Sequence, residues 1–267
     1  MSVQVQSFFH AASNTFSYVV HDPGSHQAAL IDAVLDCEPG TGAVDEAPLQ
    51  ALLAYVRAHA LEVRWLLETH AHADHVSAGQ RLKRHFPRAV LAMGEGIRAV
   101  QATFAPRYDL PTPAAEAVFD HLFTDDERFQ LGTVEGRVMA VPGHTSDSIA
   151  YLIGDALFPG DSLFMPDSGT ARCDFPGGDA RQLYRSVQRL LALPAQTRVF
   201  VCHDYGPGGR AIRNQTTIGE QRAHNIHVHE GVDEDSFVAV REARDATLPE
   251  PRLMHTAVKA NIHGGAC

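Results

Sequence analysis

The 267-residue chain has few cysteines, no long apolar segment and no positive charge near its start. Its four cysteines are widely spaced and form no Cys-x-x-Cys pair, which argues against a disulfide scaffold and a cysteine-based zinc ribbon. No apolar run approaches the roughly 20 residues that a membrane-spanning helix needs. Neither Lys nor Arg precedes Arg57, so the start lacks the basic region of a secretory signal and the Arg-rich character of a transit peptide. We therefore expect a cytoplasmic protein without a membrane partner.

Acidic residues outnumber basic ones by 32 to 22, and the formal net charge is −10. A surface of this sign repels phosphate backbones, and the basic residues form no extended cluster, so a nucleic-acid partner is not expected. Hydrophobic residues make up 45% of the chain and charged residues 20%, which predicts a folded protein with a sizeable core. The chain also contains 16 histidines, several of them spaced like metal ligands.

The hydrophobic pattern predicts short strands followed by helices. Apolar runs predict strands over residues 15–20, 27–33, 63–67, 89–93, 129–131, 134–141, 148–153, 156–158 and 198–201. Helices are expected around residues 49–56, over 76–86, and over 182–193 after a cap at Asp179. Thr217 and Glu220 match a capping box for a further helix. Each polar cluster follows a predicted strand directly, and side chains at such strand ends gather into sites in layered folds.

The main candidate site is the segment His70-Ala71-His72-Ala73-Asp74-His75. It carries three imidazoles and one carboxylate, which are ligands that suit zinc or iron. In an extended turn, His70 and His72 point to the same side. Asp74 and His75 are expected to begin the following helix and to point back toward them. A polar turn that is rich in histidine by chance is the alternative interpretation.

Three single residues at later strand ends extend this set: His144 after Gly143, Asp161 after Gly160, and His203 after Cys202. Taken singly, each is explained as a structural histidine or as an aspartate that caps a turn. Their order and their repeated position at strand ends favour a metal site instead. The remaining histidines are assigned to helix faces, loops or the tail. Among them, His227-Val228-His229 is interpreted as an exposed alternation on the surface, with a metal chelate as the alternative. Cys173 and Cys202 are interpreted as buried packing residues.

The order Thr-His-x-His-x-Asp-His, followed by Gly-His, Gly-Asp and a last His, resembles the metallo-β-lactamase superfamily over roughly residues 15–230. The resemblance implies an α+β fold, an αββα sandwich of two mixed β-sheets flanked by helices, with the metal at the edge between the sheets. It also implies one metallo-β-lactamase-like domain over residues 1–267, with a C-terminal helical extension over about 231–267. Membership of a superfamily does not by itself define the reaction.

The Gly-x-x-Arg-x-Asp-Phe stretch at residues 169–175 makes the resemblance more specific. With the segments around Asp161 and His203, it is similar to the persulfide dioxygenases, in particular to a bacterial branch labelled β-lactamase-hydrolase-like. In that family one Fe(II) per chain is held by the positions that match His70, His144 and Asp161. Such a triad of two histidines and a carboxylate leaves three positions open on one face, enough for a substrate sulfur, O2 and a displaced water.

The implied reaction is the oxidation of glutathione persulfide by O2 and water to sulfite and glutathione. Glutathione is anionic, so an acidic protein must supply local positive charge to bind it. The resemblance implies that Arg172, oriented by Asp174, pairs with a substrate carboxylate and that Tyr205 lies near the substrate. An ordinary surface ion pair and a tyrosine half buried at the sheet edge are the alternatives. A homodimer is expected by analogy alone.

A glyoxalase II-type thioesterase that hydrolyses acyl-glutathione with two zinc ions is the alternative function. Hydrolysis needs a metal-bound hydroxide, which a second metal often supports. His72, Asp74, His75 and His203 are the residues that would hold a second Zn(2+) or support the first metal. The ligand types leave both functions open, whereas the segment around Arg172 favours the dioxygenase.

Overall fold

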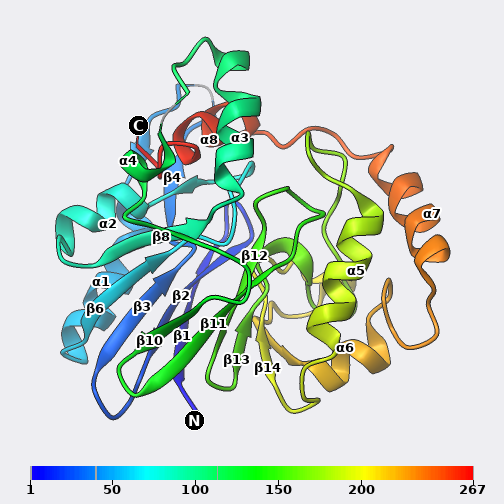
Figure 1. Ribbon diagram of the computed structural model, residues 1–267, viewed down its shortest axis with the longest axis horizontal. Coiled ribbons are helices and arrows are strands. Elements are labelled where there is room, and N and C mark those ends of the chain that lie inside the picture. The colour runs from blue at the N-terminus through cyan, green and yellow to red at the C-terminus, as the bar shows by residue number, and fades with distance from the viewer. Residues whose placement is uncertain (1, 40, 113, 267) are drawn as a thin grey trace.

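The computed structural model describes residues 2–39, 41–112 and 114–266, so positions 1, 40, 113 and 267 of the predicted domain lie outside the described residues. Two six-stranded sheets pack face to face, and helices cover the outer face of each (Figure 1). Each sheet contains both parallel and antiparallel pairs. The predicted αββα sandwich of two mixed sheets is therefore confirmed.

The first sheet has the strand order β1-β2-β3-β6-β8-β9. These strands are β1 (Gln4–His10), β2 (Thr15–His21), β3 (Gln27–Ile31), β6 (Glu62–Leu67), β8 (Val90–Gly94) and β9 (His121–Phe123). The first three pair antiparallel, and β3, β6, β8 and β9 run parallel. The helices on its outer side are α1 (Ala47–Ala58), α2 (Gly79–His85), α3 (Ile97–Phe104) and α4 (Ala115–Val118), with a 3-10 turn at Pro106–Tyr108.

The second sheet has the order β10-β11-β12-β13-β14-β15. These strands are β10 (Arg128–Leu131), β11 (Val134–Ala140), β12 (Ile149–Ile153), β13 (Ala156–Phe158), β14 (Arg198–Phe200) and β15 (Gln215–Thr217). Its outer side carries α5 (Ala180–Leu191), α6 (Ile218–His224) and α7 (Glu234–Asp245), and 3-10 turns lie at Gly160–Ser162 and Pro207–Gly209. No helix of the described residues is long and apolar enough to cross a membrane.

The predicted helix caps at Asp179 and Thr217 are both formed in the structure. The Asp179 side chain accepts a hydrogen bond from the backbone N–H of Gln182, which satisfies a donor in the first turn of α5. Thr217 and Glu220 form the reciprocal hydrogen bonds of a capping box at the start of α6. The apolar stripe of α5 is buried beneath α7 and against the second sheet, so this helix is held mainly by packing.

The core consists of three layers that follow from the sandwich. One apolar cluster lies between the first sheet and its helices, one between the two sheets, and one under α5 and α7. In β2, Val19 belongs to the first cluster and Val20 to the second, because alternate side chains of a strand point to opposite faces. Each such fully buried side chain contributes about 1.5–3 kcal/mol to stability.

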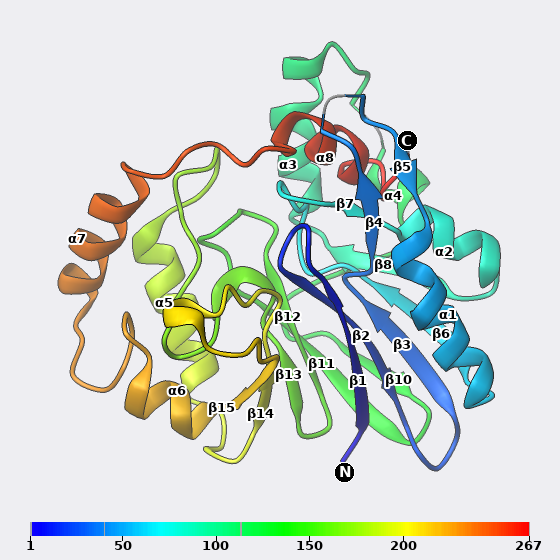
Figure 2. The ribbon, with the colours of Figure 1, turned by 180° about the vertical axis from the view of Figure 1, so that it is seen from behind.

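A small third sheet connects the N-terminal and C-terminal parts of the chain. It consists of β5 (Val44–Asp45), β4 (Val34–Cys37) and β7 (Val76–Ser77), and α8 (Met254–Asn261) packs against β7. The C-terminal residues therefore form two helices with different neighbours, since α7 packs on α5 of the second sheet. Figure 2 shows α8 beside β4 and β7, far from α7.

The helix predicted over residues 76–86 is wrong at its start. Residues 76 and 77 pair with β4, so they form strand β7 and the helix begins only at Gly79. A Cβ atom on Gly79 would lie 2.8 Å from Leu91 Cδ1, and glycine therefore allows α2 to approach β8 closely. As a consequence, Asp74 and His75 lie in a loop before β7 and not in the first turn of a helix.

Candidate metal centre

The predicted ligand side chains meet at one edge of the sandwich, where strands of both sheets end. His70 to His75 follow β6 of the first sheet, whereas His144, Asp161 and His203 follow β11, β13 and β14 of the second. Rigid strands thereby bring together residues that are up to 133 positions apart in sequence (203 − 70). All of these side chains are buried except that of Asp74, which is 31% exposed.

His70, His144 and Asp161 form the first group. One ligand atom from each lies within 4.8 Å of the others. Asp161 Oδ2 is 3.9 Å from His70 Nε2 and 3.6 Å from His144 Nε2. These separations exceed ordinary hydrogen-bond distances, and the three atoms surround one point. The group has the composition of a 2-His-1-carboxylate site.

The remaining candidates form a second group on the other side of Asp161. His203 Nε2 lies 3.4 Å from Asp161 Oδ1 and 3.5 Å from Asp74 Oδ2. His75 Nδ1 lies 3.3 Å from Asp74 Oδ1, and a set of three ligand atoms is formed with His72. Although burial alone would lower it, the Asp161 and Asp74 carboxylates raise the pKa of His203. Asp161 thus belongs to both groups, as a bridging carboxylate would.

Several buried atoms of this edge have no hydrogen-bond partner among the described residues. They are His70 Nε2, His72 Nδ1, His75 Nε2 and Asp161 Oδ1. A buried polar atom without a hydrogen-bond partner lowers the stability of the fold by about 1–3 kcal/mol. Four such atoms close together therefore destabilise the protein considerably when no ligand is bound. Three nitrogen lone pairs and a carboxylate oxygen are what a divalent transition metal would satisfy. The residues present therefore fit a bound metal.

In three of the histidines, one ring nitrogen is hydrogen-bonded within the protein, which determines which nitrogen remains for a metal. His144 Nδ1 donates to the Arg172 carbonyl over 2.7 Å, and His72 Nε2 lies 3.2 Å from Asp32 Oδ1. His70 Nδ1 lies 3.0 Å from Thr69 Oγ1. The opposite nitrogen of each ring is left for a ligand bond, as in other histidine metal sites. Burial, with neighbouring imidazoles, lowers the pKa of His70 and of His72 well below the usual value, which keeps their lone pairs available.

Two buried carboxylates under this cluster were missed by sequence reasoning. Asp32 accepts hydrogen bonds from the backbone N–H and hydroxyl of Thr69, each over 2.8 Å, as well as from His72. Burial raises the pKa of Asp32 to about 6. Glu68 accepts a hydrogen bond from Ser77 Oγ over 2.9 Å. The strand-end rule would have found Asp32, because it directly follows β3 in the same way that Asp161 follows β13.

Glycine is needed immediately before His144. Gly143 has φ = +141°, and a Cβ atom there would lie 2.3 Å from the backbone of Leu183 in the first turn of α5. The strand end and the helix can be in contact only without a side chain at this position. The contact also holds the loop that carries His144.

A cavity of about 850 Å3 opens from the metal cluster. His144, Asp161 and His203 lie in its wall beside Arg172 and Tyr205. The volume lies within the usual range for small-molecule sites of about 300–1,000 Å3. The predicted substrate residues and the predicted ligands therefore border one space.

Arg172 makes a bidentate ion pair with Asp174. Its Nε and Nη2 donate to the two carboxylate oxygens over 2.6 Å each, and its Nη1 donates to the Pro249 carbonyl over 2.7 Å. The guanidinium lies 5.0 Å from the centre of the Phe175 ring. Most of its donors are thus engaged within the protein, which holds the Arg172 side chain firmly at the cavity wall.

Tyr205 is 55% exposed and lies at the cavity mouth. Its ring is parallel to that of His203, with centroids 5.9 Å apart, and meets Phe164 edge-on. The hydroxyl is therefore accessible from the cavity, while the ring is fixed beside a candidate ligand.

The family model described as the metallo-beta-lactamase superfamily matches residues 11–203, which include all the candidate ligands. The chain belongs to the metallo-beta-lactamase superfamily. Its fold agrees with this assignment, and its histidine and aspartate cluster is consistent with a metal-binding member of the superfamily.

Relatives within the superfamily have different names. The beta-lactamase hydrolase-like protein of Xylella fastidiosa (strain Temecula1) is 47% identical over 263 residues, which are 98% of this chain and 61% of that protein. Glyoxylase B2 of Dictyostelium discoideum is 42% identical over 98% of this chain and 91% of its own length. The human protein named persulfide dioxygenase ETHE1, mitochondrial, is 27% identical over 98% and 89%. The crystal structure of ETHE1 from Myxococcus xanthus has a TM-score of 0.79 and 31% identity, and covers 99% of this chain and 100% of that one.

The cavity beside the metal cluster contains two arginine side chains that sequence reasoning missed. Arg244, at the end of α7, and Arg252, in the segment between α7 and α8, both line it. Neither guanidinium makes a hydrogen bond or ion pair with another residue among those described. Arg241 also lines the cavity, but it is paired with Asp245 over 2.7 Å. No motif marks these positions, because they reach the site only through the path of the C-terminal segment.

The interpretation of His227 as a surface residue is wrong. It lines the cavity, and its Nδ1 accepts hydrogen bonds from the backbone N–H and the hydroxyl of Thr170 over 3.0 and 3.1 Å. Burial, together with the charges of Arg241 and Arg244, lowers the pKa of His227 to about 4. The sequence alternation did not reveal this, because the covering residues come from α7 and from the loop that contains Thr170.

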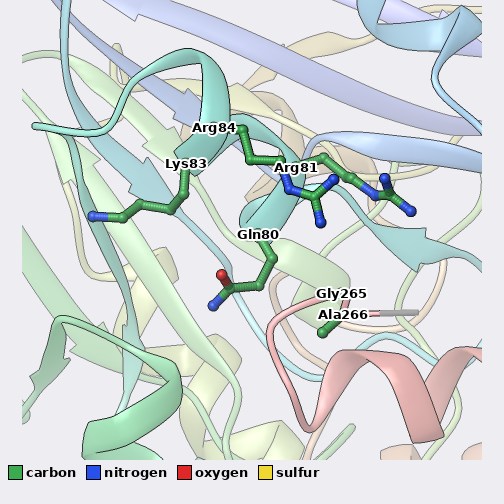
Figure 3. Close-up of a pocket in the computed structure, with 6 residues that line it drawn as sticks. All are labelled: Gln80, Arg81, Lys83, Arg84, Gly265 and Ala266. Carbon is green, nitrogen blue, oxygen red and sulfur yellow. The ribbon is translucent and has the colours of Figure 1, made fainter.

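A second pocket of about 260 Å3 lies over α2, between Gln80, Arg81, Lys83, Arg84, Gly265 and Ala266 (Figure 3). Arg81 pairs with Glu46 over 3.4 Å, and Lys83 pairs with Asp120 over 2.6 Å. None of the residues that line this pocket is a histidine, a cysteine or a carboxylate. The metal cluster therefore belongs to the larger cavity.

Proposed function

We propose that this chain is an Fe(II)-dependent persulfide dioxygenase that converts glutathione persulfide, O2 and water to sulfite and glutathione. The observation that carries the proposal is the group of His70, His144 and Asp161, with ligand atoms within 4.8 Å of one another at the end of an open cavity. Two imidazoles and one carboxylate on one face are typical of non-haem Fe(II) oxygenases. Bound Fe(II) would supply the redox chemistry that joins O2 to the terminal sulfur.

The cavity residues suit an anionic thiol of the size of a tripeptide. Glutathione carries two carboxylates and one amino group. The guanidinium groups of Arg244 and Arg252, which have no partner among the residues that the structure describes, can each form a bidentate contact with a carboxylate. Arg172 is already paired with Asp174, so it adds little net charge to the wall, and its guanidinium lies against the Phe175 ring. These groups would align the thiol with its persulfide sulfur toward the metal cluster.

The Tyr205 hydroxyl and the Ser13 hydroxyl border the space between this anion site and the ligands. The Tyr205 hydroxyl can donate a hydrogen bond to a sulfur anion or to a water molecule, and the Ser13 hydroxyl oxygen can accept one from water. His144 is held by the Arg172 carbonyl, so the metal side and the substrate side of the cavity share one segment of chain. The 31% identity to the ETHE1 structure of Myxococcus xanthus over the whole chain supports the same assignment.

Oxygen uptake by Fe(II)-loaded protein tests the proposal. Protein loaded under anaerobic conditions is mixed with glutathione persulfide and O2, and sulfite is assayed in the same vessel. We expect one sulfite per O2 consumed and about one iron per chain. Asp161→Ala, which lacks a ligand of the first group, is the matched control and should show neither iron nor uptake. Absence of uptake from iron-replete wild-type protein would contradict the proposal.

A dinuclear zinc thioesterase of the glyoxalase II type is the second candidate. It is favoured by the second group of ligands, in which His203 lies 3.4 Å from Asp161 and 3.5 Å from Asp74, and by the 42% identity to Glyoxylase B2. A bridging carboxylate and a second cation would support a hydroxide for hydrolysis. Two zinc ions per chain and rapid hydrolysis of acyl-glutathione, without oxygen uptake by the iron form, would establish this function instead.

A further inference from the structure

A series of hydrogen-bonded side chains leads from the metal cluster to the protein surface. Thr15 Oγ1 lies 3.3 Å from His203 Nδ1 and 3.4 Å from His75 Nδ1. Ser13 Oγ lies 2.7 Å from Thr15 Oγ1 and 2.7 Å from His10 Nδ1. The series ends at Asp36, whose Oδ1 lies 2.6 Å from His10 Nε2.

One arrangement of protons satisfies every contact in the series. The Nδ1–H of His203 donates to the hydroxyl of Thr15, which donates to the hydroxyl of Ser13, which donates to His10 Nδ1. The Nε2–H of His10 then donates to the Asp36 carboxylate. All donors point from the cluster outward, and the series ends at a carboxylate that accepts from His10.

The fold places this series between the cavity and solvent. Ser13 belongs to the turn between β1 and β2 and lines the cavity, whereas Asp36 lies on β4. The side chain of His10 is only 13% exposed, but that of Asp36 is 47% exposed. Figure 2 shows the turn after β1 at the same end of the molecule as β4 and β7. The backbone bridge between Thr15 and His203 holds the inner end of the series in place.

Protons must leave the cavity during turnover. In the proposed reaction, a persulfide anion, O2 and water give sulfite, glutathione and one proton, and thioester hydrolysis also releases one proton per acid formed. A substrate that fills the cavity displaces the water through which this proton would otherwise escape. The released proton can then leave through the cavity wall at the Ser13 hydroxyl, which lines the cavity.

We propose that Ser13, His10 and Asp36 form a proton exit from the active site. The proton of the Ser13 hydroxyl moves to His10 Nδ1, and Ser13 Oγ takes up the proton released by the reaction, relayed by one water molecule beside it, so no charge remains on the serine or on the water. The His10 imidazolium, paired with Asp36, then releases its proton to solvent or buffer. His10 and Asp36 are positioning residues for this transfer. The inference rests on proposed turnover at the metal cluster but not on which of the two reactions occurs.

His10→Gln tests the proposal, because glutamine can keep both hydrogen bonds but cannot carry a proton between them. We expect unchanged metal content, melting temperature and KM, with kcat lowered about 10-fold or more at low buffer concentration. Imidazole should restore kcat in His10→Ala, and Ser13→Ala should not respond to it. His85→Gln, on the exposed side of α2, is the matched control and should behave as the wild type.

A second measurement does not depend on activity. Nitrogen-15 spectra of the histidine rings should show His10 in the Nε2–H form, and Asp36→Asn should disturb that form in the metal-free protein as well. An unchanged kcat in His10→Gln, or a lowered kcat that imidazole does not restore in His10→Ala, would overturn the proposal. Inactive wild-type protein in both assays would refute the proposed function, whereas the ring spectra would still test the proton arrangement.

Discussion

Removal of the half-buried histidine in the cavity wall should change how stability depends on pH. His227 is neutral in the folded protein, because burial and the charges of Arg241 and Arg244 lower its pKa, and its Nδ1 accepts two hydrogen bonds from Thr170. Its pKa is lowered from 6.5 to about 4. The unfolded chain therefore binds more protons at this site between these two values, and stability contributed by the neutral form is lost as the pH falls through that interval.

The expected magnitude follows from the size of the shift. A pKa that falls from 6.5 to about 4, with part of the effect screened by solvent at this half-buried side chain, gives a loss of roughly 2–3 kcal/mol between pH 7 and pH 4 from this group. His227→Gln keeps an acceptor for Thr170 but does not titrate. The difference in unfolding free energy between the wild type and His227→Gln should therefore decrease by roughly 2–3 kcal/mol over that range.

Urea unfolding followed by circular dichroism measures this difference. Both proteins are treated with a chelator, so that metal binding does not contribute to the pH dependence. His224→Gln, which removes an exposed imidazole three positions earlier, should follow the wild type. If the difference between the wild type and His227→Gln stays constant from pH 7 to pH 4, burial and the two arginines do not hold His227 neutral and the reasoning fails.

Four further outcomes are expected. Asp161→Ala should lose bound metal and activity together, as measured by metal analysis and turnover, because Asp161 borders both ligand groups; retention of full metal would contradict this placement. Asp32→Asn should weaken metal binding about 10- to 100-fold in a competition titration, because it alters the partner of His72; unchanged affinity would show that this contact is unimportant. Arg252→Ala should raise KM for glutathione persulfide with little effect on kcat, and equal KM values would remove Arg252 from substrate binding. Gly169→Ala should destabilise the protein by about 1–3 kcal/mol in the same urea assay, because φ is +82° and a Cβ would lie 2.2 Å from His227 Nδ1; wild-type stability would refute this.

Short-range patterns predicted the elements with clear local causes. The caps at Asp179 and Thr217 work as expected, because a side-chain acceptor and its backbone donor lie three residues apart. The start of α2 was not predictable in this way, since residues 76 and 77 pair with β4, which is about 40 positions earlier. Helical spacing says nothing about such long-range partners.

The ligand motif at residues 70–75 and the later His144, Asp161 and His203 were identifiable from the order of residues alone, because metal ligands are restricted to a few side-chain types at strand ends. Only the tertiary structure shows that Asp161 stands between two ligand groups and that Asp32 supports His72. Likewise, the free guanidinium groups in the cavity and the series from His203 to Asp36 join segments that no local pattern connects. The physical reason is that residue type and spacing govern local chemistry, whereas contact between distant segments depends on how the two sheets and the C-terminal helices pack.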